Sequence, residues 1–65
     1  MYAIKWTDNN KNIIRSGLLT NAFSLKNTSE IVLYETVEQA ELDIVYLKKA
    51  AKELGATMKF EVVSL

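Results

Sequence analysis

The chain of 65 residues contains no cysteine and no histidine. Disulfide bonds, zinc sites with Cys or His ligands, thiol redox chemistry and nucleophiles activated by histidine are therefore excluded. A domain this short usually needs disulfides, metals or self-association to supplement its small core. Self-association is the support that remains. We therefore expect residues 1–65 to form one small domain that gains stability as a homodimer.

Glycine is almost as scarce, since Gly17 and Gly55 stand alone. A glycine-rich loop that would hold a phosphate is excluded by this scarcity. Carboxylates are present at Glu38, Glu41 and Asp43, but they fall on a solvated helix face, whereas an acid/base site needs a desolvated pocket. We therefore predict a protein that is not an enzyme and that binds no cofactor or metal ion.

Long apolar runs are also missing. No segment approaches the roughly 18 apolar residues of a membrane span, and the N-terminal MYAIKWTDNN lacks the apolar stretch of a signal peptide. These absences predict a cytoplasmic protein that has no membrane partner. The formal net charge is zero, although residues 1–29 are net basic and residues 30–65 net acidic. A nucleic-acid binder of this size usually has a basic excess, so the charge balance disfavours nucleic acid.

What is present predicts four strands and one helix. Residues 2–6 alternate large apolar side chains with Ala3 and Lys5, which is typical of a half-buried strand. The polar run 8–12 predicts a turn, and residues 13–19 predict the returning strand, with Gly17 as a bulge or an end. The β-branched run 30–35 predicts a third strand buried on both faces. Residues 57–65 predict a closing strand with Met58, Phe60 and Val62 on one side.

The helix has clear signals at both ends. Thr36 and Gln39 fit a capping box, in which the Thr36 hydroxyl accepts from the Gln39 amide and the Gln39 side chain reaches back to the Thr36 amide. Gly55 is suited to the position just after the helix, where a left-handed backbone is common. The predicted order is β-β-β-α-β, an α+β fold whose mostly antiparallel sheet is crossed by one long helix. Residues 20–29 fit either one helical turn or a loop that brings Phe23 and Leu25 to the core.

The run LYETVEQAELDIVYLKKAAKELGATMKFEVVSL, together with the opening strand YAIKW, resembles small uncharacterised proteins of phages and prophages of Gram-positive bacteria. The resemblance covers about residues 30–65 and the first strand, and it carries no catalytic motif. It implies a small accessory protein that acts in the cytoplasm of a bacterial host cell.

The helix carries two apolar stripes. One has the spacing of a core face and comprises Val37, Ala40, Ile44, Leu47, Ala51 and Leu54. Leu42, Tyr46 and Ala50 follow one another at intervals of four on nearly the opposite side, with Val45 on one flank. They are either an ordinary exposed i,i+4 pair with a helix-favouring alanine, or a surface that docks a second copy or another protein. We favour the docking surface.

A second candidate patch is formed by Trp6 and Arg15 in the predicted hairpin. Trp6 is either a core residue or an interface residue, since tryptophan is enriched at binding hot spots. The leading hypothesis is a non-catalytic inhibitor or recruiter that binds a bacterial host protein and is a homodimer. One alternative is a single-stranded nucleic-acid-binding module built from Lys5, Trp6, Lys11 and Arg15. The other alternative, which rests on the phage-like context alone, is a protein that sequesters a small ligand at an oligomer interface.

Overall fold

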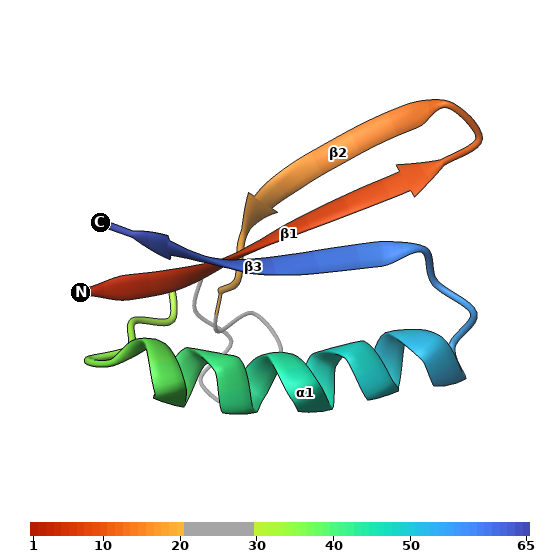
Figure 1. Cartoon of the computed structure of the whole chain (residues 1–65). Helices are drawn as coiled ribbons and strands as arrows, with labels where there is room; N and C mark the ends of the chain where they lie inside the picture. The colour runs from red at the N-terminus through yellow and green to blue at the C-terminus, as the bar shows by residue number, and fades with distance from the viewer. Residues whose placement is uncertain (21–29) are drawn as a thin grey trace.

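The structure is a computed structural model that describes residues 1–20 and 30–65. Its elements follow in the order β1 (Tyr2–Asn10), β2 (Ile13–Leu18), α1 (Val37–Glu53) and β3 (Met58–Ser64). The three strands form one antiparallel sheet in the order β2-β1-β3. The helix lies across one face of this sheet (Figure 1). The predicted α+β class and the single long helix are therefore confirmed.

The hairpin is longer than predicted and its turn is tighter. β1 continues to Asn10, which pairs with Ile13, so Lys11 and Asn12 alone make the turn. Both have positive φ, 52° and 67°, which is the backbone of a two-residue type I′ turn. The polar residues after Trp6 remain in the strand because β1 is paired on both sides, with β2 and with β3.

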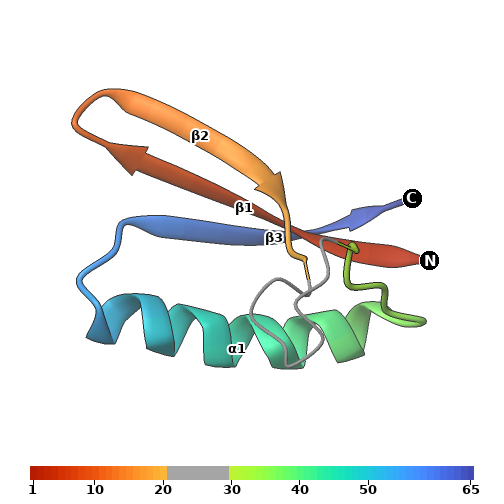
Figure 2. The ribbon, with the colours of Figure 1, turned by 180° about the vertical axis from the view of Figure 1, so that it is seen from behind.

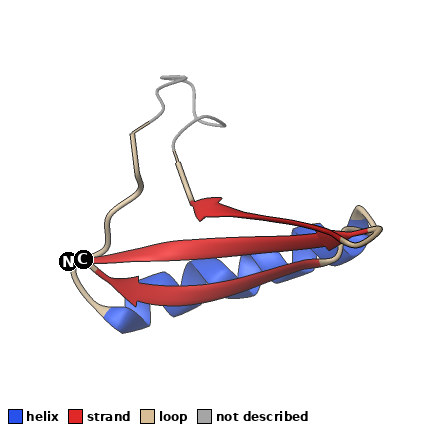
Figure 3. Ribbon diagram, turned by 90° about the horizontal axis from the view of Figure 1, so that it is seen from above, coloured by secondary structure: helices blue, strands red, loops and turns tan. Residues whose placement is uncertain are grey.

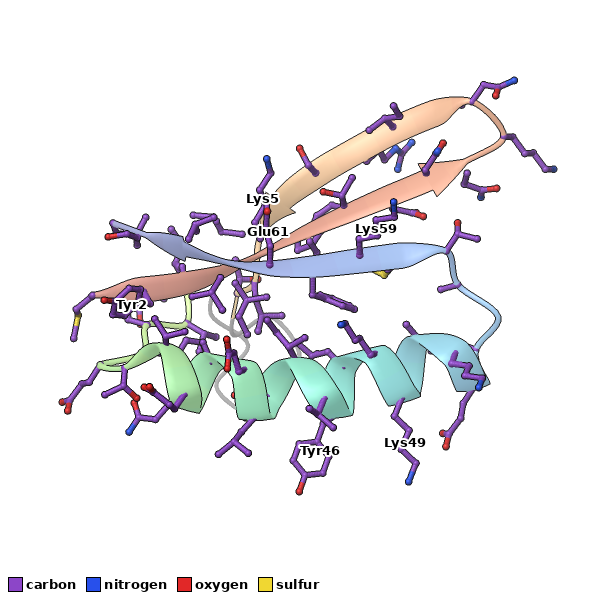
Figure 4. All side chains as sticks on the ribbon, in the orientation of Figure 1. Tyr2, Lys5, Tyr46, Lys49, Lys59 and Glu61 are labelled. Carbon is purple, nitrogen blue, oxygen red and sulfur yellow. The ribbon has the colours of Figure 1, made fainter. Side chains whose placement is uncertain are left out.

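Alternation along β1 and β3 separates two faces of the sheet. Ile4 pairs with Val62 and Trp6 pairs with Phe60, and this set faces α1. Lys5 and Glu61 pair on the other face, which the helix does not cover (Figure 4). The helix packs against β3 and β1, whereas β2 rises away from it in both side views (Figure 1, Figure 2). The helix therefore does not cover the hairpin tip.

The predicted third strand is wrong. Within residues 1–20 and 30–65, the segment 30–35 forms two isolated bridges and no strand: Thr20 pairs with Ile31 and Tyr2 with Tyr34. This segment was expected to be buried on both faces, yet Ile31 and Leu33 are 42% and 49% exposed. The physical reason is that the segment meets β1 at Tyr2, beyond the end of β2, and otherwise meets Leu19 and Thr20, which follow β2. It therefore gains a few backbone hydrogen bonds rather than a continuous ladder.

The core lies between α1 and the sheet. In the described part of the chain its buried centre consists of Ile4, Tyr34, Ala40 and Ile44. Partly buried apolar residues from β1, α1 and β3, from the position just after β2 and from the segment before α1 surround this centre: Tyr2, Leu19, Val32, Leu47, Phe60 and Val62. The predicted core stripe of the helix is confirmed except at its end. Leu54 is 84% exposed because it is the C-cap, beyond the last turn that packs on the sheet.

Both helix ends match their predicted signals, with one difference. Thr36 is the N-cap, and its Oγ1 accepts a hydrogen bond from Gln39 N at 3.2 Å. The Gln39 side chain accepts from Glu35 N rather than from the predicted Thr36 amide. At the other end Gly55 has φ of 70°. The amides of Gly55 and Ala56 donate to Lys52 O and Ala51 O, the bond pattern of a Schellman motif.

The prediction for residues 20–29, a helical turn or a loop that brings Phe23 and Leu25 to the core, falls on residues 21–29, which lie outside the described residues. Thr20 itself forms the bridge to Ile31.

Candidate protein-binding surfaces

The predicted docking stripe is open to solvent. We call Leu42, Tyr46 and Ala50 the back face of α1. Leu42 is 65% exposed, Tyr46 is 72% exposed and Ala50 is also exposed. The Tyr46 side chain points away from the sheet (Figure 4). The opposite side of the same helix is buried through Ala40, Ile44 and Ala51. The single chain therefore leaves a row of apolar side chains in water.

The border of the back face carries charges of both signs. Glu38, Lys49 and Glu53 are exposed around it, and Val45 on its flank is 64% exposed. An apolar centre with a polar, mixed-charge rim is the usual composition of a protein–protein contact. This mixed charge does not suit the phosphate backbone of a nucleic acid, which needs an excess of positive charge.

Trp6 and Arg15 are brought to one face of the hairpin. Trp6 pairs with Gly17 and Asp8 pairs with Arg15, so the side chains of Trp6 and Arg15 project on the same side of the two strands. Trp6 is half-buried and Arg15 is exposed. This patch is separate from the back face, because α1 packs on β1 and β3 while β2 rises away from it.

Gly17 has a role that differs from the predicted bulge or strand end. It lies within the regular ladder, and the Trp6 indole lies across it. A Cβ at position 17 would be 3.0 Å from Trp6 Cζ2 and 3.2 Å from Cε2. A side chain here would force the indole to shift by a few tenths of an ångström, so glycine allows the indole to lie close to the β2 backbone. Trp6 consequently fulfils a structural function as well as lining the patch.

The basic residues of the hairpin do not form one patch. Lys5 projects from the face away from α1 and lies 3.8 Å from Glu61 Oε1. Trp6 and Arg15 project from the other face, and Lys11 lies at the turn. A single strand of nucleic acid that stacks on Trp6 would therefore not contact Lys5. The four residues on which the nucleic-acid alternative depends therefore do not lie on one surface.

A groove between α1 and β3 was not anticipated from the sequence. Its helix wall includes Val37, Glu41, Val45 and Lys48, and its strand wall includes Phe60 and Val62. A neighbouring hollow continues it past Lys48 and Phe60 toward Lys52 and Met58. Together they follow the side of the molecule formed by β3. No sequence signal could have located this groove, because it exists only if β3 lies at an edge of the sheet.

The two edges of the sheet are β2 and β3. Within residues 1–20 and 30–65, β3 pairs with β1 alone, so its outer edge has no strand beside it. Seen from above, β3 lies on the side of the sheet opposite to β2, with α1 running beneath (Figure 3). An unpaired strand edge presents free N–H and C=O groups and is a template for pairing with another chain.

Tyr34 fastens the segment before α1 to the helix. Its hydroxyl donates a 2.6 Å hydrogen bond to Asp43 Oδ2. Burial raises the pKa of the Tyr34 phenol well above its ordinary value, and the hydrogen bond and negative charge of Asp43 raise it further. This arrangement stabilises the neutral phenol. It is structural, because neither group lies on a candidate binding surface.

In the ranges that the structure describes, no three Asp or Glu side chains gather closely enough to hold a metal ion. Over the same ranges, no helix is both long and apolar enough to cross a membrane. Comparisons of the chain with protein-family models, with curated proteins and with solved structures find no match.

Proposed function

We propose that this chain is a non-catalytic binding protein that acts as a homodimer and docks a bacterial host protein through the back face of α1. In this proposal it is a phage or prophage accessory protein that inhibits or recruits its target in the bacterial cytoplasm. The proposed phage or prophage origin and the bacterial host rest on the resemblance of the helix and the strands around it to such proteins. The binding role rests on the exposed side of the helix.

The observation that carries the proposal is the exposure of Leu42 and Tyr46 on a helix that is already packed on its other side. Fully burying a side chain such as leucine contributes roughly 1.5–3 kcal/mol. Leu42 and Tyr46, 65% and 72% exposed, together represent a few kcal/mol that a partner surface can recover. Tyrosine adds a hydroxyl that can donate or accept at the contact, as hot-spot residues often do.

A direct test is affinity capture from lysates of a Gram-positive bacterium with three forms of the chain: wild type, Leu42→Glu/Tyr46→Lys and Ile13→Lys/Ile14→Glu. The third form is a matched control, because Ile13 and Ile14 are also large, apolar and exposed, at 60% and 70%, but lie on the hairpin. We expect a stoichiometric partner that the helix variant loses and the control retains. The purified pair, measured by calorimetry, should then lose at least about tenfold in affinity with the helix variant.

The opposite pattern would contradict the proposal. If the helix variant captures the same protein as wild type while the hairpin variant does not, the contact belongs to the hairpin rather than to the back face. If a labelled single-stranded oligonucleotide is shifted instead, with an affinity that falls steeply with salt, the nucleic-acid alternative replaces it.

A further inference from the structure

We propose that two copies of this chain pair antiparallel through the outer edges of β3, with Phe60 opposite Phe60 of the second copy, so that one sheet runs through both. This inference rests on the homodimer of the proposed function and assigns its interface. It also separates the surface that makes the dimer from the surface that binds the target.

Of the two edges of the sheet, the edge of β3 is the better site for pairing. The outer edge of β3 is seven residues long and no described strand lies beside it. The other edge strand, β2, is followed by the bridge between Thr20 and Ile31, so the chain itself continues along that side. β2 also rises away from α1 and would extend the sheet without a helix layer beneath it (Figure 1). β3 has α1 packed against it and can extend both layers at once.

The charges on β3 favour one register of this pair. In a two-fold antiparallel pair, residues equally far before and after the axis face each other. With Phe60 on the axis, Lys59 of each copy faces Glu61 of the other. Moving the axis to position 59 or 61 would place Lys59 against Lys59 or Glu61 against Glu61. Opposite charges across a sheet stabilise the pair and like charges destabilise it, so the Phe60 register is favoured.

The charges involved are in position to pair. Lys59 and Glu61 are both exposed, and both project from the face away from α1 (Figure 4). Glu61 already has Lys5 of β1 at 3.8 Å on one side. The second copy would place Lys59 on its other side, where no described strand now lies. Each Glu61 would then lie between two lysines in a row across the sheet. β2 has no such complementarity, because Arg15 is its only charged residue.

The facing flanks of the two helices are also complementary in charge. The groove beside β3 places Glu41, Val45 and Lys48 along the flank of α1 that faces this edge. Lys52 lines the hollow that continues the groove. The acid precedes Val45 in the chain and the lysines follow it. Two helices related by the same two-fold axis run antiparallel, so the acidic half of each flank faces the basic half of the other. The half-buried Phe60 and Val62 would be covered from the open side.

The back face remains available in this dimer. Val45 and Lys48 belong to the flank next to β3, whereas Tyr46 points away from the sheet (Figure 4). A dimer formed through β3 therefore presents two copies of the back face to target proteins.

The register is tested by charge exchange, measured by sedimentation velocity and light scattering on the full chain. Wild type is expected to be a dimer. Lys59→Glu alone and Glu61→Lys alone each create two like-charge pairs, and each should weaken dimerisation at least about tenfold. An equimolar mixture of the two variants should form a heterodimer, because every facing pair in the mixture is again opposite in charge. Restoration on mixing also shows that both variants are folded.

The failures are distinguishable. If wild type is a dimer that both variants leave intact, the β3 interface is overturned, and monomers of Leu42→Glu/Tyr46→Lys would then place self-association on the back face. If the separate variants are monomers and stay monomers when mixed, the Phe60 register is overturned. If wild type is a monomer at millimolar concentration, both the interface and the homodimer are overturned, while target capture by the back face is still decided by its own experiment.

Discussion

Tyr34 joins three parts of the molecule at the scale of one residue. Its backbone N–H donates to Tyr2 O at 2.8 Å, and its C=O accepts from Tyr2 N at 2.9 Å. Its side chain is 8% exposed and reaches Asp43 on α1. Together with the hydrogen bond from Val32 N to Leu19 O, this residue holds the irregular segment before the helix in place.

Tyr34→Phe should lower the free energy of unfolding by about 1–2 kcal/mol at neutral pH, because it removes a hydrogen bond from a buried phenol to a carboxylate. The matched control is Tyr46→Phe, which changes the same hydroxyl on a side chain 72% exposed. It should change stability by less than about 0.5 kcal/mol. Urea unfolding of the two variants and wild type measures both values.

The raised pKa of Tyr34 makes the free energy of unfolding depend on pH. The unfolded chain releases this proton near pH 10, while the folded chain retains it. The contribution of the residue is therefore complete below about pH 10 and is lost as the pH rises further, by up to about 1.4 kcal/mol per pH unit. The stability difference between wild type and Tyr34→Phe should narrow between pH 10 and 11. A constant difference across that range would contradict the burial of the phenol.

At the scale of elements, local signals were enough for the helix and the hairpin but not for residues 30–35. Thr36, Gln39 and Gly55 act on backbone groups within a few residues, so their effects are readable from the sequence. The fate of residues 30–35 depends instead on where β2 ends and which part of the β1 edge stays open. The apolar, β-branched composition of residues 30–35 does not indicate which part of the β1 edge is open to them.

The hairpin turn can be improved, because both of its central residues have positive φ. Asn-Gly is the preferred pair for a type I′ turn, and the chain has Lys11 and Asn12 there. Lys11→Asn/Asn12→Gly should stabilise the protein by about 0.5–1 kcal/mol, since relief of left-handed strain exceeds the entropy cost of glycine. Asn12→Ala should destabilise it by about 1 kcal/mol. If thermal unfolding ranks the two variants in the reverse order, the turn type is wrong.

At the scale of the whole molecule, the candidate surfaces differ in how far the sequence could predict them. The back face followed from periodicity alone, because Leu42, Tyr46 and Ala50 lie on one helix. The Trp6 and Arg15 patch needed the pairing register, and the structure places both on one face. The β3 edge and its groove needed the strand order, which is set by contacts between distant parts of the chain. The alternating charges of Lys59 and Glu61 indicate pairing with a second copy only once β3 is known to be an edge strand.

The small core gives the whole molecule a reason to associate. Its buried centre, in the described part of the chain, contains four residues, one of which is Ala40. A chain of this length buries only about 60% of its unfolded surface, so its stability as a monomer is expected to be marginal. Covering Phe60 and Val62 at a β3 interface would add apolar burial to the same core. Dimerisation and folding are then linked, and linkage is measurable without knowledge of any target.

The midpoint of thermal unfolding should therefore rise with protein concentration, by roughly 3–6 °C for each tenfold increase, because mass action stabilises a dimer whose subunits separate on unfolding. Lys59→Glu should lower the midpoint and remove most of this dependence, since it weakens the β3 contact. Leu42→Glu/Tyr46→Lys should keep the dependence of wild type, because the back face lies outside that contact. Calorimetry over two decades of concentration separates these cases. A wild-type midpoint that does not change with concentration would mean that each chain folds alone and that the β3 edge stays unpaired in solution.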